Sequence, residues 1–176
     1  MDKPIQKYIL GFGIIIIVVF GLLYFTKKDD AVGINAGWKT QTNLAQKVEF
    51  MYPESIGKTY ITPTDWPPIA KVSQGKLACA ETQVGVVGVG QITLARINGD
   101  NYCITKASEG AAGSTYTKYV YEKEVDDKTV GMEFTLRYPQ CANYDEAAKT
   151  LCETEQGSFE LDNLVDEMFE TIKFID

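Results

Sequence analysis

Four cysteines are the residues of this chain whose type and spacing carry the clearest chemistry. Cys79, Cys103, Cys141 and Cys152 contain no Cys-x-x-Cys pair, and the chain has no histidine. This pattern disfavours a redox-active dithiol and a mixed cysteine–histidine zinc site, and it predicts two disulfides. Four cysteines allow three connectivities. We expect Cys79 with Cys103 and Cys141 with Cys152, because each pair brackets a compact unit. The alternative is four buried free thiols in a reducing compartment.

The absence of histidine also limits the catalytic chemistry. A Ser-His-Asp or Cys-His arrangement and a His-Glu-x-x-His zinc helix are excluded. The acidic pairs Asp126-Asp127 and Asp145-Glu146 could bind a cation or serve a glycosidase, but such pairs are recognised by their separation in space. The sequence therefore assigns no catalytic, cofactor-binding or metal-ligating residue, and no cofactor is expected.

Two glycine-rich stretches resemble phosphate-binding loops only superficially. Gly85, Gly88 and Gly90 lack the Gly-x-Gly-x-x-Gly order and a following Lys-Ser/Thr. The stretch Gly110–Thr115 offers amides and hydroxyls that could cradle an anion. Because small residues between strands ordinarily form turns, a turn is the preferred interpretation of Gly110–Thr115.

An uncharged apolar run precedes the part of the chain that holds the cysteines. Tyr8–Phe25 comprises 18 residues without a charge, with Lys7 before them and Lys27-Lys28 after them. A helix that crosses the hydrocarbon core needs about 20 such residues, so a transmembrane anchor in the lipid bilayer through residues 8–25 is predicted. The run is longer than the core of a cleaved signal peptide, and no small-x-small site follows it.

The lysines on both sides of this run leave its orientation open, and the cysteines decide it. Disulfides persist outside a reducing cytosol, so the amino terminus is expected inside and the remainder exported. The expected localisation is the cell membrane, as a single-pass protein whose carboxyl-terminal domain is extracytoplasmic.

The chain divides into an amino-terminal stub with the anchor (residues 1–28), a flexible linker (29–37) and one extracytoplasmic domain (38–176). Beyond residue 28 the chain holds 13 basic and 23 acidic side chains, a net charge of about −10. Such a domain repels nucleic acid and anionic headgroups, and no nucleic-acid partner is expected. A solvated acidic surface accounts for the excess without any partner.

Apolar periodicity predicts an α+β domain that begins with strands. Val48–Tyr52 is expected as the first strand, ended by Pro53. Tyr60–Ile69 contains three prolines and is expected as an ordered loop, with Trp66 plugging the edge of the core. The alternative for Trp66 is an exposed binding anchor.

Two hairpins are predicted in the middle of the domain. The first joins residues 91–97 and 101–106 through Asn98-Gly99-Asp100, since Asn-Gly favours a tight turn. The second joins residues 115–123 and 130–138 across Asp126-Asp127-Lys128. Alternating side chains in the last of these strands predict an antiparallel sheet that is covered on one side only.

The carboxyl-terminal segment changes to a helical period. Apolar residues between Leu161 and Ile172 predict a helix capped by Asp162, whose polar face includes Asp166. A shorter helix is expected from residue 145 to 155, and residues 173–175 as an edge strand. Both helices are expected to pack on one face of the sheet, in a domain stapled by disulfides.

Several short motifs carry a resemblance to a known group. They are Gly37-Trp38-Lys39-Thr40, Val48-x-Phe50-x-Tyr52-Pro53, Trp66-Pro67-Pro68, Tyr102-Cys103, Gly110-Ala-Ala-Gly-Ser-Thr-Tyr116 and Phe134-Thr-Leu-Arg-Tyr-Pro-Gln-Cys-Ala-Asn-Tyr-Asp145. Together they resemble uncharacterised bacterial envelope proteins that are single-span or lipid-anchored. The opening strand and closing helix are also distantly similar to PsbP-like domains, which implies an accessory rather than a catalytic role.

Two function classes follow from these observations. The first is a membrane-tethered extracytoplasmic protein that binds or organises an envelope partner without catalysis. Its candidate contacts are Trp66, Tyr116, Tyr119 and Tyr121. The alternative is a carboxylate-based envelope enzyme such as a glycan hydrolase. Oligomeric state is not indicated by the sequence.

Overall fold

A computed structural model describes residues 37–82 and 90–176 of the 176-residue chain. The predicted anchor Tyr8–Phe25, residues 29–36 of the predicted linker, and Gly85 and Gly88 lie outside the described residues. Among those that are described, no helix combines the length and apolar character that crossing a membrane requires.

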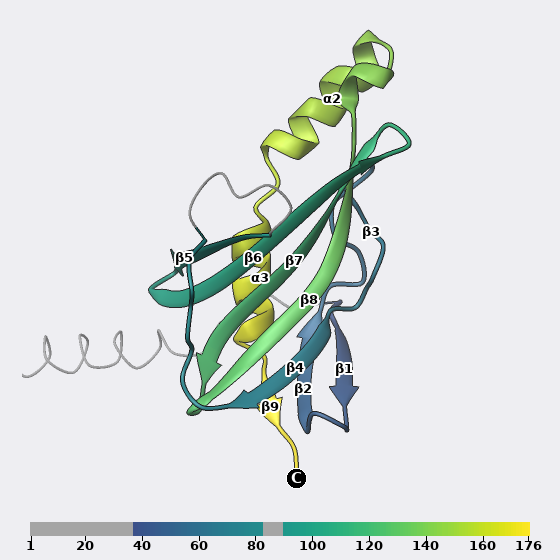
Figure 1. The fold of residues 1–176 in the computed structure, drawn as a ribbon. Coiled ribbons are helices and arrows are strands. Elements are labelled where there is room, and N and C mark those ends of the chain that lie inside the picture. The colour runs from purple at the N-terminus through teal and green to yellow at the C-terminus, as the bar shows by residue number, and fades with distance from the viewer. Residues whose placement is uncertain (1–36, 83–89) are drawn as a thin grey trace, which may run out of the picture. The chain divides into compact units, whose positions relative to one another are not determined.

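Most of the described domain is antiparallel β-sheet (Figure 1). Its strands are β1 (Lys39–Asn43), β2 (Val48–Tyr52), β3 (Thr62–Pro63), β4 (Ile69–Gln74), β5 (Gln91–Ile97), β6 (Asp100–Ala111), β7 (Ser114–Val125), β8 (Lys128–Pro139) and β9 (Lys173–Phe174). A six-stranded sheet has the order β3-β8-β7-β6-β5, with β4 also paired to β8, and a three-stranded sheet has the order β1-β2-β9.

Tight turns join the long strands β5 to β8. Asn98 and Gly99 have φ of 50° and 106°, and Asp126 and Asp127 have φ of 49° and 60°, the positive values that two-residue hairpin turns require. Both predicted hairpins are therefore confirmed. β5 has the predicted bounds, and the other three strands are longer than predicted. β6 is extended most, because it continues to Ala111 and meets β7 in a third hairpin.

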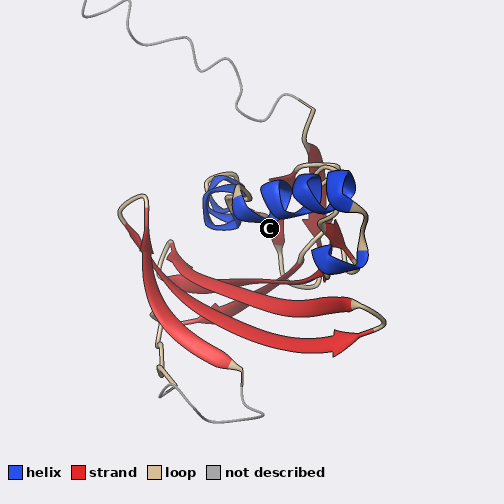
Figure 2. Cartoon of the chain, turned by 90° about the horizontal axis from the view of Figure 1, so that it is seen from above, coloured by secondary structure: helices blue, strands red, loops and turns tan. Residues whose placement is uncertain are grey.

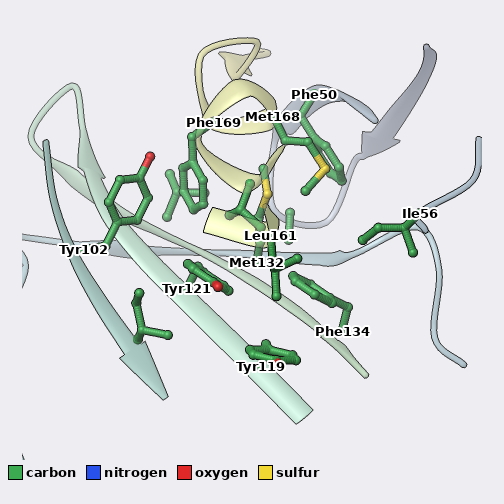
Figure 3. Packing of buried hydrophobic residues seen from close by; sticks show 14 of the residues in the cluster. Phe50, Ile56, Tyr102, Tyr119, Tyr121, Met132, Phe134, Leu161, Met168 and Phe169 are labelled. Carbon is green, nitrogen blue, oxygen red and sulfur yellow. The ribbon is translucent and has the colours of Figure 1, made fainter. Parts of the chain in front are cut away.

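One face of the six-stranded sheet carries the core and the helix α3 (Leu161–Phe169) (Figure 2). The alternation in β8 places Val130, Met132, Phe134 and Leu136 inside, where they meet apolar side chains of α3 and β2 (Figure 3). Burying large side chains of this kind contributes about 1.5–3 kcal/mol each before conformational entropy is subtracted. The predicted antiparallel sheet with one covered face is confirmed.

The two helices have different relations to this core. Helix α3 buries Leu161, Val165, Met168 and Phe169, whereas α2 (Glu146–Gly157) buries only Cys152. The expectation that both helices pack on the sheet therefore holds for α3 alone, because the sequence of α2 offers too few apolar residues for a second covering stripe. Asp145 caps α2 through its side chain, but Asp162 lies inside α3 and does not cap it.

All four cysteines are paired as predicted. Cys79 is bonded to Cys103 and Cys141 to Cys152, with Cα–Cα distances of 5.3 and 5.6 Å. The first bond fastens the segment after β4 to β6. The second fastens the start of the segment after β8 to α2, which the apolar core does not hold.

Three strands, β1, β3 and β4, were not predicted from the sequence. β1 consists of the polar residues 39–43, and its pairing with β2 comes from tertiary context rather than from an apolar alternation. β4 begins directly after the proline-rich loop and pairs with β8. Within that loop, β3 adds a two-residue edge contact to β8. The predicted first strand β2 and the predicted edge strand β9 are confirmed.

Candidate functional site

The densest group of polar side chains lies where α3 crosses β6 and β7. Asp166 of α3 is only 6% exposed. Its Oδ1 accepts a hydrogen bond from the Tyr102 hydroxyl at 2.5 Å, and its Oδ2 accepts one from Asn98 Nδ2 at 2.8 Å. Tyr102 comes from β6 and Asn98 from the turn before it, so the hairpin positions both donors around one carboxylate.

Lys123 of β7 supplies the positive charge of this group. Its Nζ lies 2.7 Å from Asp100 Oδ2, 3.0 Å from Glu170 Oε1 and 3.4 Å from Asp166 Oδ1. It also lies 5.3 Å from the centroid of the Tyr102 ring, a cation–π distance. We call Asp100, Tyr102, Lys123, Asp166 and Glu170 the Asp166 cluster.

Electrostatics hold Asp166 and Lys123 in their charged forms. Burial favours the neutral carboxyl of Asp166, but the hydrogen bonds from Tyr102 and Asn98 and the charge of Lys123 outweigh burial and lower its pKa. Burial likewise favours the neutral amine of Lys123, yet its carboxylate partners Asp100 and Glu170 raise its pKa. The ammonium and the carboxylates therefore stabilise each other at neutral pH.

The carboxylates of this cluster have the spacing of a cation site. Oxygen atoms of Asp100, Asp166 and Glu170 lie within 4.8 Å of one another. Lys123 Nζ contacts all three carboxylates and neutralises part of their charge, as a bound cation would. A depression of about 420 Å³, which Asp100, Asn101 and Lys123 help to line, adjoins the group. The geometry suits an internal ion pair better than a site for an added metal.

Asp166 and Lys123 were not identified from the sequence. The helical pattern placed Asp166 on the polar face of its helix, and the structure corrects this because Asp166 faces the sheet and is buried. The alternation of β7 contains the missed signal. Lys123 follows the buried Tyr119 and Tyr121 at intervals of two, so it also points inward, where a lysine requires an acidic partner.

Two predicted contact residues, Tyr119 and Tyr121, belong to the core. Tyr121 is 0% and Tyr119 is 8% exposed, and their rings stack with Phe134 (Figure 3). The hydroxyl of Tyr121 donates to Asp162 at 2.5 Å, and that of Tyr119 lies 3.0 Å from the hydroxyl of Tyr138. Their proposed role at a surface is therefore wrong, because both occupy inward positions of β7.

Trp66 and Tyr116, the other two contact candidates, are both half-buried. Trp66 packs against Phe134 with the ring centroids 5.6 Å apart, and its Nε1 donates to the carbonyl of Pro53 at 2.9 Å. These contacts agree with the interpretation of Trp66 as a plug at the edge of the core. Tyr116 lies toward the start of β7, opposite Glu109 and Arg137.

A second polar site joins α2 to the loop before β3. Oε1 of Glu155 accepts hydrogen bonds from the consecutive backbone amides of Lys58, Thr59, Tyr60 and Ile61, at 2.9 to 3.1 Å. Burial favours the neutral carboxyl, but these amides outweigh burial and lower the pKa of Glu155. Such converging amides form an anion-binding nest, and here the anion comes from the chain itself.

The turn that forms this nest depends on a glycine. Gly57 has φ of +71°, and a Cβ at this position would lie 2.4 Å from the carbonyl oxygen of Ile61. A cavity of about 480 Å³ lies beside the nest and is lined by Tyr60, Leu151 and Phe159 among others. The sequence signal for the nest is a glycine followed by four residues other than proline. This pattern is too short to identify an anion-binding turn from the sequence.

The remaining candidates from the sequence have structural roles in the described domain. Asp126 and Asp127 form the turn between β7 and β8, and Asp145 accepts a hydrogen bond from Ala148 N as the cap of α2. Within Gly110–Thr115, Ala112 and Gly113 form a turn, as the preferred interpretation has it, and the other four residues belong to the paired ends of β6 and β7.

Comparison of the sequence with models of protein families and with curated proteins finds no match. The chemistry of the domain is accordingly inferred from its own geometry. That geometry shows carboxylates engaged by internal donors at each site, in the Asp166 cluster by Lys123 and Tyr102 and in the nest by backbone amides.

Proposed function

We propose that this chain is a membrane-tethered extracytoplasmic protein whose domain binds or organises another envelope component without catalysing a reaction. The observation that carries the proposal is the pair of disulfides in a domain that follows an uncharged run of 18 residues. Disulfides persist in oxidising compartments, and a run of this length suits a bilayer span. The resemblance to envelope proteins and to PsbP-like accessory domains supports the same role.

The engagement of the acidic groups supports a role without catalysis. A glycoside hydrolase needs one carboxylic acid that keeps its proton and a second carboxylate across a sugar-sized space. In the Asp166 cluster the pKa of Asp166 is lowered rather than raised, and Lys123 lies among the three carboxylates. The carboxylate-based glycan hydrolase therefore remains the weaker alternative.

The proposed contact surface is the face of the six-stranded sheet opposite to the core, outside the part where the segment after β4 is bonded to Cys103. The side chains of Ile69 and Leu94 are each 51% exposed, and the strand registers place them on the face opposite to the core, together with Tyr116. Ion pairs from Lys71 and Lys118 to Glu133 lie on the same face. Interfaces that form reversibly are about as apolar as the rest of a protein surface, so this composition is compatible with reversible binding.

Protease treatment of intact spheroplasts tests the proposed location. The full chain should sediment with membranes, and external protease should degrade the domain that begins near Gly37. Protection from a protease that cleaves a control protein on the same surface would contradict the topology. Recovery of the untreated protein in the soluble fraction would contradict the anchor.

Activity measurements test the proposed absence of catalysis. The purified full chain should release no product from envelope glycans or from peptide, ester and phosphate substrates. If hydrolysis occurs and is lost in Glu170→Gln, the glycan-hydrolase alternative replaces the binding role. Asp100→Asn serves as a second variant of an exposed carboxylate in the same cluster.

A further inference from the structure

In the six-stranded sheet, other segments of the domain bond to the outer edges of β4 and β5. At β4, Asn43 Nδ2 donates to the carbonyl of Ala70 and Gln46 Oε1 accepts from the amide of Val72. At β5, Thr82 exchanges two hydrogen bonds with Ile92, and Glu81 accepts from the amide of Leu94. Occupied edges of this kind prevent pairing with another chain.

Strand β1 forms one of the two edges of the three-stranded sheet (Figure 1). The amide of Met51 on β2 donates to Thr171 Oγ1 at 2.7 Å and so points away from β1. Thr40 is the register partner of Met51. Because this pair is not hydrogen-bonded, the amide and carbonyl of Thr40 point away from β2. The same alternation turns the amide and carbonyl of Thr42 outward.

These outward groups have no hydrogen-bond partner among residues 37–82 and 90–176. Both threonine side chains beside them are exposed. Lys39, the charged residue of β1, forms an ion pair with Glu54 at 2.6 Å, and the strand contains neither proline nor a bulge. Two of the devices that usually protect an edge strand are therefore absent from β1, and the charge of its lysine is partly neutralised by Glu54.

The edge is complementary to itself. Two antiparallel β1 strands centred on Gln41 would pair Thr40 of each with Thr42 of the other, and four backbone hydrogen bonds would form. The charged Lys39 would then face the neutral Asn43 of the second copy, so no like charges oppose each other. Gln41 would face its own copy at the two-fold axis, as an isologous contact requires.

We propose that β1 is the docking edge for β1 of a second copy of this chain, in an antiparallel pair centred on Gln41. The inference rests on the proposed function, because the membrane anchor is what would make a weak pair of β1 strands form. Five residues pair weakly, and the surplus of acidic side chains makes two free domains repel. Anchors confine two copies to one plane and raise their effective concentration, and β1 starts only about a dozen residues after the apolar run.

Cysteine crosslinking in the full-length chain tests the pair. Residues opposite each other in a non-hydrogen-bonded antiparallel pair have Cα atoms about 4.5 Å apart, within the range that a disulfide spans. Gln41→Cys should therefore give a covalent dimer in membranes under mild oxidation. Thr40→Cys is the matched control, because its two copies would lie more than about 7 Å apart although the side chain is more exposed.

A proline in the same chain tests the hydrogen bonds. The amide of Thr42 points away from β2, so Thr42→Pro removes a bond of the pair but none of the β1–β2 ladder. Thr42→Pro in the Gln41→Cys chain should abolish the dimer while the native disulfides still map as Cys79–Cys103 and Cys141–Cys152.

Three results would overturn the pair. They are equal crosslinking at positions 40 and 41, no crosslink at position 41 in a folded chain, and a crosslink that survives the proline. Fractionation of the same samples reports the anchor separately. A chain in the soluble fraction that still crosslinks through position 41 would support the pair and contradict the tether.

Discussion

Lys123 Nζ on β7 lies 3.4 Å from Asp166 Oδ1 on α3, so charge as well as apolar packing joins the helix to the sheet. The carboxylate also accepts from Tyr102 and Asn98, and its side chain is almost fully buried. A buried charge without its partners costs far more than the intact pair contributes. The cluster therefore makes the position of α3 sensitive to each of these groups.

Replacing Asp166 should destabilise the domain strongly. Asp166→Ala leaves Lys123 and the Tyr102 hydroxyl with fewer partners inside the domain, and we expect a loss of about 3–5 kcal/mol in the free energy of unfolding. Urea unfolding followed by tryptophan fluorescence measures it. Glu170→Ala is the control, because Glu170 is exposed and should change the stability by about 1 kcal/mol or less. Equal losses of unfolding free energy in the two variants would contradict the larger contribution that we assign to the buried Asp166.

Stability should decrease at high pH. Burial is the main cause that raises the pKa of Tyr102 and Tyr121, and their hydrogen bonds to Asp166 and Asp162 add to it. A pKa that folding raises gives stability that is complete below the unfolded value of about 10 and is lost as pH rises toward the folded value. Tyrosinate absorbance should therefore show these tyrosines ionising together with unfolding above pH 10. Early ionisation in the folded domain would contradict this.

Much of the sheet could be predicted from the sequence, because its signals are local. Asn98-Gly99 and the alternation from Met132 to Tyr138 require only neighbouring residues to identify a turn and a half-buried strand. The pairings of the cysteines followed from short separations along the chain. In contrast, β1 is polar, and its place in a sheet depends on β2 rather than on its own composition.

The polar sites were less predictable, because they depend on distances between distant segments. Asp166 has the position of a surface residue in a helical pattern, and its burial depends on the hairpin turn at Asn98, 68 residues away along the chain. Glu155 likewise meets amides that lie more than 90 residues earlier. Tyr119 and Tyr121 were assigned to the wrong face because aromatic residues suit both a core and an interface.

Replacing Glu155 should loosen the loop before β3. Glu155→Gln keeps the size of the side chain but removes the negative charge and places an amide donor toward backbone donors, so we expect a loss of about 1–3 kcal/mol. Hydrogen exchange at the amides of residues 58–61 should accelerate. Glu153→Gln, two residues earlier on an exposed side of α2, should leave exchange at these amides unchanged. Unchanged exchange in both variants would show that the nest does not hold the loop.

Replacing Trp66 separates its two interpretations. Trp66 packs edge-on against Phe134 and Tyr52 and donates to Pro53, so Trp66→Ala should lower the stability by about 3–5 kcal/mol, as for other large aromatic residues in cores. Trp66→Phe retains part of the packing and should cost less. Tyr116→Ala on the face of the sheet opposite to the core should leave the melting temperature nearly unchanged. If Trp66→Ala also leaves the melting temperature unchanged while partner binding is lost, Trp66 is an exposed anchor, and the proline-rich loop replaces that face of the sheet as the contact surface.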